Sequence, residues 1–143
     1  MITTKISGVD PLLRNFNRKK KGIEDALTQG TSDAADHLID CITEKFGRYQ
    51  PGWAKLKPDT VRKKGHDEPL IETSDMMFSF YKQISAKTRK HVVWVKSDDP
   101  KLPHHMYGAP GANVPKRDPV RPTTKEENDA CLEIIAEAVR SIL

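Results

Sequence analysis

Residues 53–73, Trp-Ala-Lys-Leu-Lys-Pro-Asp-Thr-Val-Arg-Lys-Lys-Gly-His-Asp-Glu-Pro-Leu-Ile-Glu-Thr, are the stretch around which the rest of the chain is organised. The stretch has too few apolar residues for a core element, but Trp53 and Leu56 can anchor it. We expect a short helix from Pro58, because proline fits the first helical turn and the next residue is acidic. Gly65 should end that helix. A long loop with its own anchors usually has a function.

The composition indicates one domain that finishes burying its surface in an assembly. The chain has 143 residues, of which 36% are hydrophobic and 31% charged, so a small core and large polar faces are expected. No apolar run of membrane-spanning length and no signal-peptide pattern occurs, so we expect neither a membrane segment nor ordinary export. Two distant cysteines, Cys41 and Cys131, are interpreted as reduced thiols rather than a disulfide or metal site. The net charge of +4 permits contact with nucleic acid without demanding it.

The N-terminal third has the periodicity of an amphipathic helix. Its apolar residues recur at spacings of three, four and seven from Val9 to Phe46. Gly30 interrupts the pattern just before a helix-start triplet, so we expect either one long helix with a weak point there or two stacked helices. Gly47 should end the segment. Four neighbouring cations, residues 18–21, are either a phosphate contact or a solvated helix face, and their splay around the axis favours the solvated face.

The middle of the chain predicts a small antiparallel sheet. Residues 73–75 offer a second helix start, followed by a short, strongly apolar helix. β-Branched and aromatic residues then predict a hairpin that pairs residues 80–87 with residues 91–97, with a turn at residues 88–90. Residues 104–108 are predicted either as a third strand or as a short helical segment.

The C-terminal part predicts an extended segment and a helix. Three prolines between residues 114 and 122 exclude a helix and fit only an edge strand of the sheet. Thr123 or Thr124 should cap the last helix, an amphipathic one with two glutamates in its first turn. The fold class is therefore α+β: a long N-terminal helix or helix pair, a small antiparallel sheet with a hairpin and a proline-rich edge strand, and a C-terminal amphipathic helix.

The most basic part of the chain lies between Arg48 and Lys64 and contains two aromatic residues. Such a segment can bind single-stranded nucleic acid by stacking. The alternative, which we favour, is that Trp53 and Leu56 cap the hydrophobic core while the cations face water or a neighbouring subunit. The residues that could face DNA are Lys55, Lys57, Arg62, Lys63 and Lys64.

The sequence gives no positive sign of catalysis, a cofactor or a metal. His37 and Cys41 are spaced for one helix face, but two further zinc ligands are not evident. No nucleophile-elbow, phosphate-binding or zinc-protease motif occurs. A metal-dependent nuclease would need carboxylates that converge in space, and no pattern predicts this. We therefore expect a protein that is not an enzyme and has no catalytic, cofactor-binding or metal-binding residues.

Several short motifs follow one another in a recognisable order: Trp53-Ala-Lys-Leu-Lys-Pro-Asp-Thr60, Lys63-Lys64, Pro69-Leu-Ile-Glu-Thr-Ser-Asp-Met76, His105-Met-Tyr-Gly108 and Val114-Pro-Lys-Arg117 before Pro119. This order resembles the signature of tail-completion proteins of tailed bacteriophages, in the virion-morphogenesis and minor-tail-component families. It covers about residues 30–143. Two residues depart from the pattern, because Ser74 stands where the family often has glycine and Asp118 separates Arg117 from Pro119. The resemblance implies that the motif and interface residues are Trp53, Leu56, Pro58, Thr60, Lys64, Leu70, Thr73, His105, Tyr107, Gly108, Val114, Pro115 and Arg117.

The resemblance implies a structural protein of the virion neck or upper tail, assembled in the host cytoplasm. Such proteins form a ring, often of six copies, between the tail tube and the head connector, with genomic DNA passing through the lumen. A ring needs two different patches on each copy, and residues 53–64 and 114–121 are the candidates. Residues 31–143 would form the core, and residues 1–30 are a candidate arm that orders on assembly. The alternative function is a small basic nucleic-acid-binding module.

Overall fold

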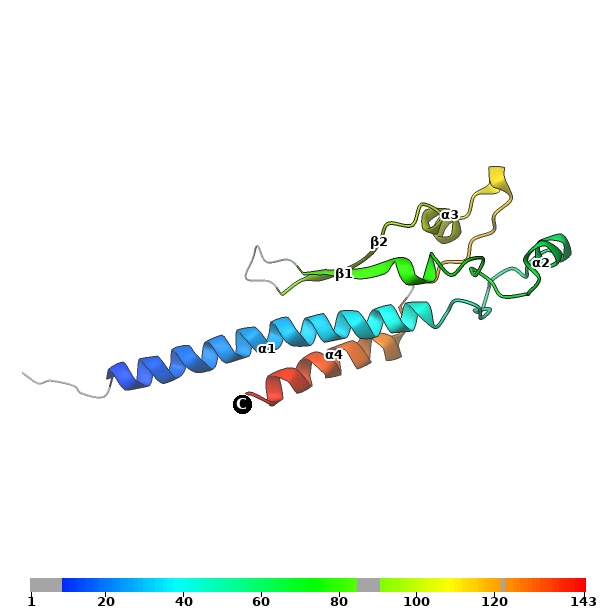
Figure 1. Ribbon diagram of the computed structural model, residues 1–143. Helices are drawn as coiled ribbons and strands as arrows, with labels where there is room; N and C mark the ends of the chain where they lie inside the picture. Colours follow the sequence, from blue (N-terminus) through cyan, green and yellow to red (C-terminus); the bar gives the residue numbers. More distant parts are fainter. Residues whose placement is uncertain (1–8, 85–90, 122) are drawn as a thin grey trace, which may run out of the picture.

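The chain is organised along one long helix, as the computed structural model in Figure 1 shows. The structure describes residues 9–84, 91–121 and 123–143. The long helix packs against a second helix on one side and a two-stranded sheet on the other, which confirms the predicted α+β class. The elements in chain order are α1 (Val9–Thr43), α2 (Pro58–Lys64), η1 (Met77–Ser79), β1 (Phe80–Ile84), β2 (Val93–Ser97), α3 (Leu102–Tyr107), η2 (Pro110–Ala112) and α4 (Lys125–Arg140).

Helix α1 runs through Gly30 without a break, so of the two predicted arrangements the single long helix is correct. The glycine marks the place where α4 comes closest. A Cβ atom on Gly30 would lie 3.0 Å from Ala138 Cβ and 3.0 Å from Ile135 Cα. Helical hydrogen bonding stops at Thr43, and turns continue to Gly47, which has φ +76° and donates its N–H to Pro69 O. The predicted stop at Gly47 is therefore close to the observed end.

Helix α4 lies antiparallel to α1, with its first turn near the end of α1. Its N-terminus is closed by a capping box, in which Thr124 Oγ1 accepts from Glu127 N and Glu127 Oε2 accepts from Thr124 N. Glu127 also pairs with Lys45 at 2.9 Å, whereas the other end of α4 brings Ile142 close to Gly22. Thr124 is thus the cap, as the sequence predicted.

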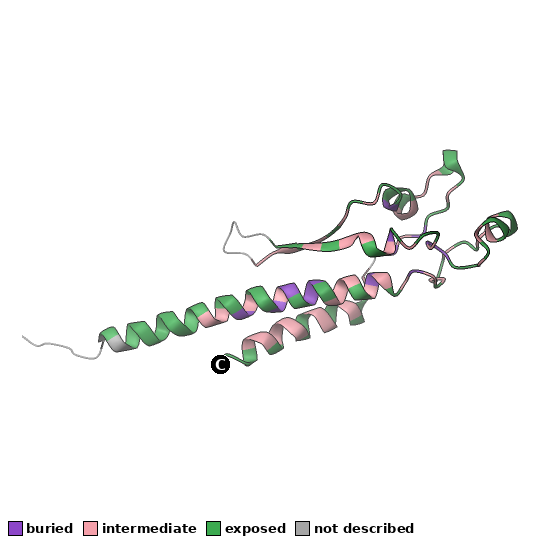
Figure 2. Ribbon diagram, viewed as in Figure 1, coloured by how far each residue is buried: buried purple, intermediate pink, exposed green. Residues whose placement is uncertain are grey.

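The sheet consists of β1 and β2, paired antiparallel from Phe80↔Ser97 to Ile84↔Val93. Lys82 reaches from the sheet to α1, where it pairs with Asp36 and donates to Ser32 Oγ at 2.7 Å. The core lies at the C-terminal end of α1, and Figure 2 colours the buried residues purple. Its buried residues are Ile42, Phe46, Leu70, Met76 and Leu102.

Two sequence predictions about this middle region need correction, and a third cannot be compared with the structure. The expected apolar helix after residue 75 is only the short 3₁₀ turn η1, because Ser74 adopts φ +63° and Phe80 already pairs with β2. The proline-rich segment is not an edge strand of the described sheet. Its prolines lack an N–H, and Arg117 N donates to His105 O instead. The predicted turn at residues 88–90 lies outside the described residues.

The open alternative for residues 104–108 is decided in favour of a helix, since they fall in α3 and the glycine after it. Helix α2 starts at Pro58 and is ended by Gly65 in the left-handed conformation, as predicted. No helix among the described residues has the length and apolarity needed to cross a membrane.

Candidate functional site

Arg117 joins three segments that are far apart in the sequence. Its side chain is only 4% exposed, and its Nε and Nη2 donate to Ala54 O at 2.9 and 2.7 Å. Nη2 also donates to Lys55 O at 3.3 Å. On the backbone, Arg117 N donates to His105 O at 2.7 Å. Burial lowers the pKa of Arg117, but a guanidinium stays charged, so the carbonyl oxygens must satisfy a buried cation.

The turn that follows α3 is fixed by backbone geometry. Gly108 has φ +79°, which favours glycine, and a Cβ atom there would approach Lys116 N at 3.4 Å. Ala109 and Val114 then form an isolated antiparallel bridge with N–H to O distances of 2.9 and 3.0 Å. The bridge holds the loop 110–113 out from the body, as the yellow segment of Figure 1 shows. This local order explains why the histidine-to-glycine motif and the valine-proline motif occur together.

The surroundings of His105 in this turn disfavour its charged form. Its Nδ1 is buried and has no hydrogen-bond partner among the described residues. Burial lowers the pKa of His105 first, and the positive charge of Arg117 lowers it further. A neutral imidazole beside a buried guanidinium suits a structural role, because a second positive charge there would be repelled.

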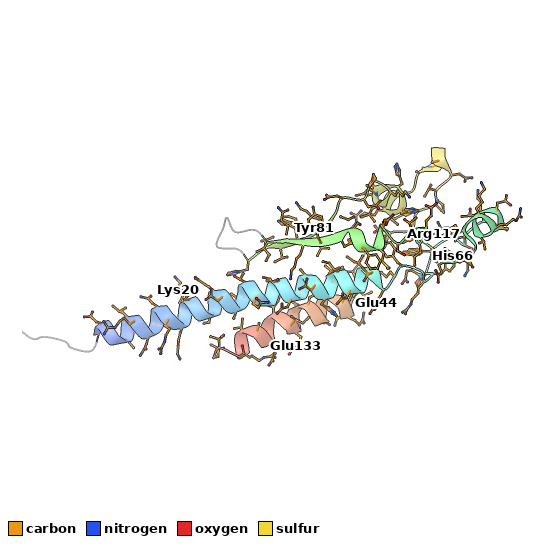
Figure 3. The ribbon with its side chains drawn as sticks, in the orientation of Figure 1. Lys20, Glu44, His66, Tyr81, Arg117 and Glu133 are labelled. Atoms are coloured by element: carbon orange, nitrogen blue, oxygen red, sulfur yellow. The ribbon has the colours of Figure 1, made fainter. Side chains whose placement is uncertain are left out.

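A hollow of about 870 Å³ lies between the α2 region and the turn that Arg117 and His105 build. Every predicted motif residue except Trp53 and Pro58 lines it, although these residues come from four separate stretches of sequence. Figure 3 shows the side chains of this region around the labelled Arg117. The two segments predicted as separate patches, residues 53–64 and 114–121, therefore each contribute to the lining of one surface. We call this surface the hollow.

Trp53 lies behind the hollow rather than in it. It is half-buried and packs against the core cluster, as expected of an anchor. Leu56 is also half-buried, but it lines the hollow, and its role as a core anchor stays a prediction. Tyr49 adds an anchor that the sequence did not reveal. Its hydroxyl donates to Asp67 Oδ1 at 2.6 Å and accepts from Leu56 N at 2.9 Å.

The cations predicted to face DNA divide into two groups. Lys55 lies over the Tyr49 ring at 3.8 Å, Arg62 pairs with Asp59, and Lys64 donates to Glu68 O at 2.7 Å. Within the described ranges, Lys57 and Lys63 are exposed and make no ion pair. All but Arg62 line the hollow, where cations outnumber acids; its charged residues are Lys55, Lys57, Lys63, Lys64, Glu72, Asp75, Asp99, Lys101, Lys116 and Arg117.

The cysteines lie at the contact between α1 and α4. Cys41 Sγ is 3.6 Å from His37 Nε2, and Cys131 Sγ donates to Ala34 O at 3.6 Å. Both thiols are free and half-buried, and burial raises the pKa of each. The described residues contain no group of three or more histidine, cysteine or acidic side chains that could hold a metal ion.

Comparisons with models of known protein families, with curated proteins and with solved structures found no match. The arrangement of the hollow is consequently the main basis for a functional conclusion. Its lining combines buried apolar residues such as Leu70 and Met76 with exposed charged residues, among which cations outnumber acids. We call these exposed charged residues the cationic rim. Such a surface suits an acidic segment of another molecule.

Proposed function

We propose that the protein is a structural subunit of the neck or upper tail of a tailed bacteriophage. In this role it completes the tail and joins it to the head connector, as a homo-oligomeric ring of about six copies around the DNA channel. No reaction is catalysed. The observation that carries the proposal is the convergence of the tail-completion-like motifs on one surface, with Arg117 as the common link. Motifs that matched by chance would not be expected to meet in space.

The exposed surface of the chain supports assembly. A folded monomer of 16.1 kDa is expected to expose about 7,400 Å², whereas this chain exposes 10658 Å². When the residues outside the described ranges are counted as fully exposed and removed from the comparison, roughly 1,400 Å² of excess remains. A copy that makes two standard interfaces buries a comparable area, about 800 Å² in each.

The hollow is the proposed contact with the head connector or the tail tube. Its cationic rim suits an acidic segment of that partner. Because the two predicted patches form one surface, the hollow alone cannot supply both sides of a head-to-tail ring contact. The proposed location is the virion, with assembly in the host cytoplasm, and DNA in the lumen would be met without sequence specificity.

A gene-disruption experiment tests the proposal. A nonsense mutation in the gene for this chain, in the phage or prophage that carries it, should give DNA-filled heads and separate tails in electron micrographs of the lysate. Wild-type protein supplied from a plasmid should restore joined particles. A double variant, Lys57→Glu with Lys63→Glu, should fail to restore them. The control is Arg48→Glu with Lys96→Glu, which is equal in charge change, exposed and outside the hollow, and it should restore them. Normal virions without the protein would contradict the proposed role.

The alternative role, a nucleic-acid-binding module, rests on the cationic rim alone. Stacking on bases is disfavoured, because Trp53 packs against the core and the Tyr49 hydroxyl is held by Asp67. The two roles differ in a fluorescence-anisotropy titration of the isolated protein with single-stranded DNA. The binding module predicts tight binding that weakens steeply as salt rises. The neck subunit predicts weak binding without sequence preference.

A further inference from the structure

The first three turns of α1 continue past the end of α4, as Figure 1 shows. We call residues 9–21 the arm. Figure 2 colours its described side chains as exposed, in contrast to the middle of α1, where α4 and the sheet cover the helix. The arm carries three large apolar side chains, Leu12, Leu13 and Phe16, which are 69%, 53% and 67% exposed. Single exposed apolar side chains are common on protein surfaces, but a contiguous group of them indicates an interface. These three side chains therefore indicate a contact with another subunit.

The apolar side chains of the arm lie in line with the stripe that seats α4. Leu12 and Phe16 are four residues apart, and the steps from Phe16 to Ile23, Leu27 and Gly30 are seven, four and three. Residues at these spacings share one helix face. The arm therefore extends the helix-binding face of α1 beyond the helix that α1 already binds. The occupant that fits this face is another amphipathic helix.

Helix α4 has a second apolar stripe that its own α1 leaves partly uncovered. Leu132 is 65% exposed, and the half-buried Ala136 and Val139 follow at steps of four and three. They lie beside the α1-facing side chains Cys131, Ile135 and Ala138, each one position further along the chain. The stripe is flanked by exposed acids, among them Glu133, which Figure 3 labels on α4. We call this stripe and its acids the outer face of α4.

The charges of the two surfaces are complementary. The arm has five cations and one acid, including Lys20 in Figure 3, whereas α4 has five acids and two cations. Both cations of α4 pair with acids of the same helix, Lys125 with Asp129 and Arg140 with Glu133 and Glu137, and the helix keeps a net negative charge. Contact between two arms would bring ten cations together, and contact between the arm and the cationic hollow would repel as well. The outer face of α4 is the apolar surface of opposite charge.

We propose that the arm of one copy packs on the outer face of α4 of a second copy. Each copy has one arm and one outer face, so the contact is head-to-tail and can repeat around a closed ring. Spacings of three and four on both surfaces suit helix packing at a shallow crossing angle. The inference rests on the proposed function in one respect, that copies of the chain assemble, and it leaves the hollow free for the head connector or tail tube.

A complementation experiment with two variants tests the contact. The arm variant carries Leu12→Asp and Phe16→Asp, and the face variant carries Leu132→Arg. Each should be monomeric by light scattering after size-exclusion chromatography, while the wild type assembles. A mixture should give a complex of twice the monomer mass and nothing larger, because the intact face of one variant can accept only the intact arm of the other. Raising the salt concentration should weaken this complex.

Circular dichroism should show unchanged helicity in both variants, since the substituted side chains are exposed. Phe78→Asp, at an equally exposed apolar residue of η1, is the control and should assemble as the wild type does. A face variant that assembles normally, a mixture that stays monomeric, or a wild type that is monomeric at the highest concentration it tolerates would each overturn the contact. The neck role is tested separately, because normal virions in the lysate of the disrupted phage would contradict that role and say nothing about the contact between copies.

Discussion

Replacing Arg117 should detach the α2 region from the rest of the molecule. The guanidinium makes three hydrogen bonds to Ala54 O and Lys55 O, and hydrogen bonds to charged groups contribute about 1.5–3 kcal/mol each. Both carbonyl-bearing residues are exposed, so water replaces part of what is lost. We expect Arg117→Met, which keeps the apolar stem, to lower the free energy of unfolding by about 2–3 kcal/mol.

Urea unfolding followed by circular dichroism measures this change, and hydrogen exchange locates it. Amides of residues 53–65 should exchange faster in the variant, whereas those in the centre of α1 should change little. Arg48→Met is the matched control, because Arg48 is exposed and forms no ion pair with another described residue. It should change the free energy of unfolding by at most about 0.5 kcal/mol. Equal effects of the two substitutions, or unchanged exchange in residues 53–65, would refute the assigned role of Arg117.

Three further substitutions test the packing, the buried histidine and the helix cap. Gly30→Ala should lower the melting temperature, because overpacking costs about 1–3 kcal/mol and exceeds the gain in helix propensity of about 1 kcal/mol; its Cβ would meet Ala138 at 3.0 Å. His105 has a lowered pKa in the fold, so the unfolded chain binds its proton more readily. Stability should fall as the pH drops below about 6.5, and His105→Gln should flatten that dependence in urea titrations between pH 7 and 5. Thr124→Ala should cost about 1 kcal/mol by removing the cap, and Thr124→Ser should restore most of it.

Each of the predictions for Gly30, His105 and Thr124 has an outcome that would contradict it. Gly111→Ala, where nothing lies within 4 Å of the new Cβ, is the control for Gly30, and an equal response at both sites would argue against close helix contact. An unaltered pH dependence in His105→Gln would assign the acid sensitivity to other groups. For the cap, identical stability of the alanine and serine variants at position 124 would contradict the capping box.

Local signals in the sequence predicted the element ends well. Pro58 and Gly65 bound α2, and Thr124 caps α4, because these residues act through their own backbone geometry or through a neighbour three residues away. Gly30 gave a misleading signal. In isolation a glycine weakens a helix by about 1 kcal/mol, but here tertiary contact with α4 requires its missing side chain. That contact depends on a residue more than a hundred positions further along, which local periodicity does not reveal.

The motifs in the sequence contain most of the residues that line the hollow, but they do not predict how these residues are arranged. An arginine such as Arg117 is normally expected at the surface. Its burial depends on hydrogen bonds to backbone carbonyls some sixty residues earlier, which no local signal reveals. The proline-rich segment was assigned to the sheet because it must be extended, but an extended segment need not find a strand partner. An assembly arm was expected within residues 1–30, but its pairing with the outer face of α4 was not. Each surface follows from helical spacing, but only the fold shows which faces are left uncovered.

Locating the protein on purified phage particles tests whether it is a subunit of the virion neck. Antibodies against this chain, coupled to gold, should label the junction between head and tail in electron micrographs. Particles from a lysate of the disrupted phage, treated in the same way, provide the background. Label at the junction is the result that the account predicts. Virions without label, with the protein recovered only from the soluble fraction of the lysate, would contradict it.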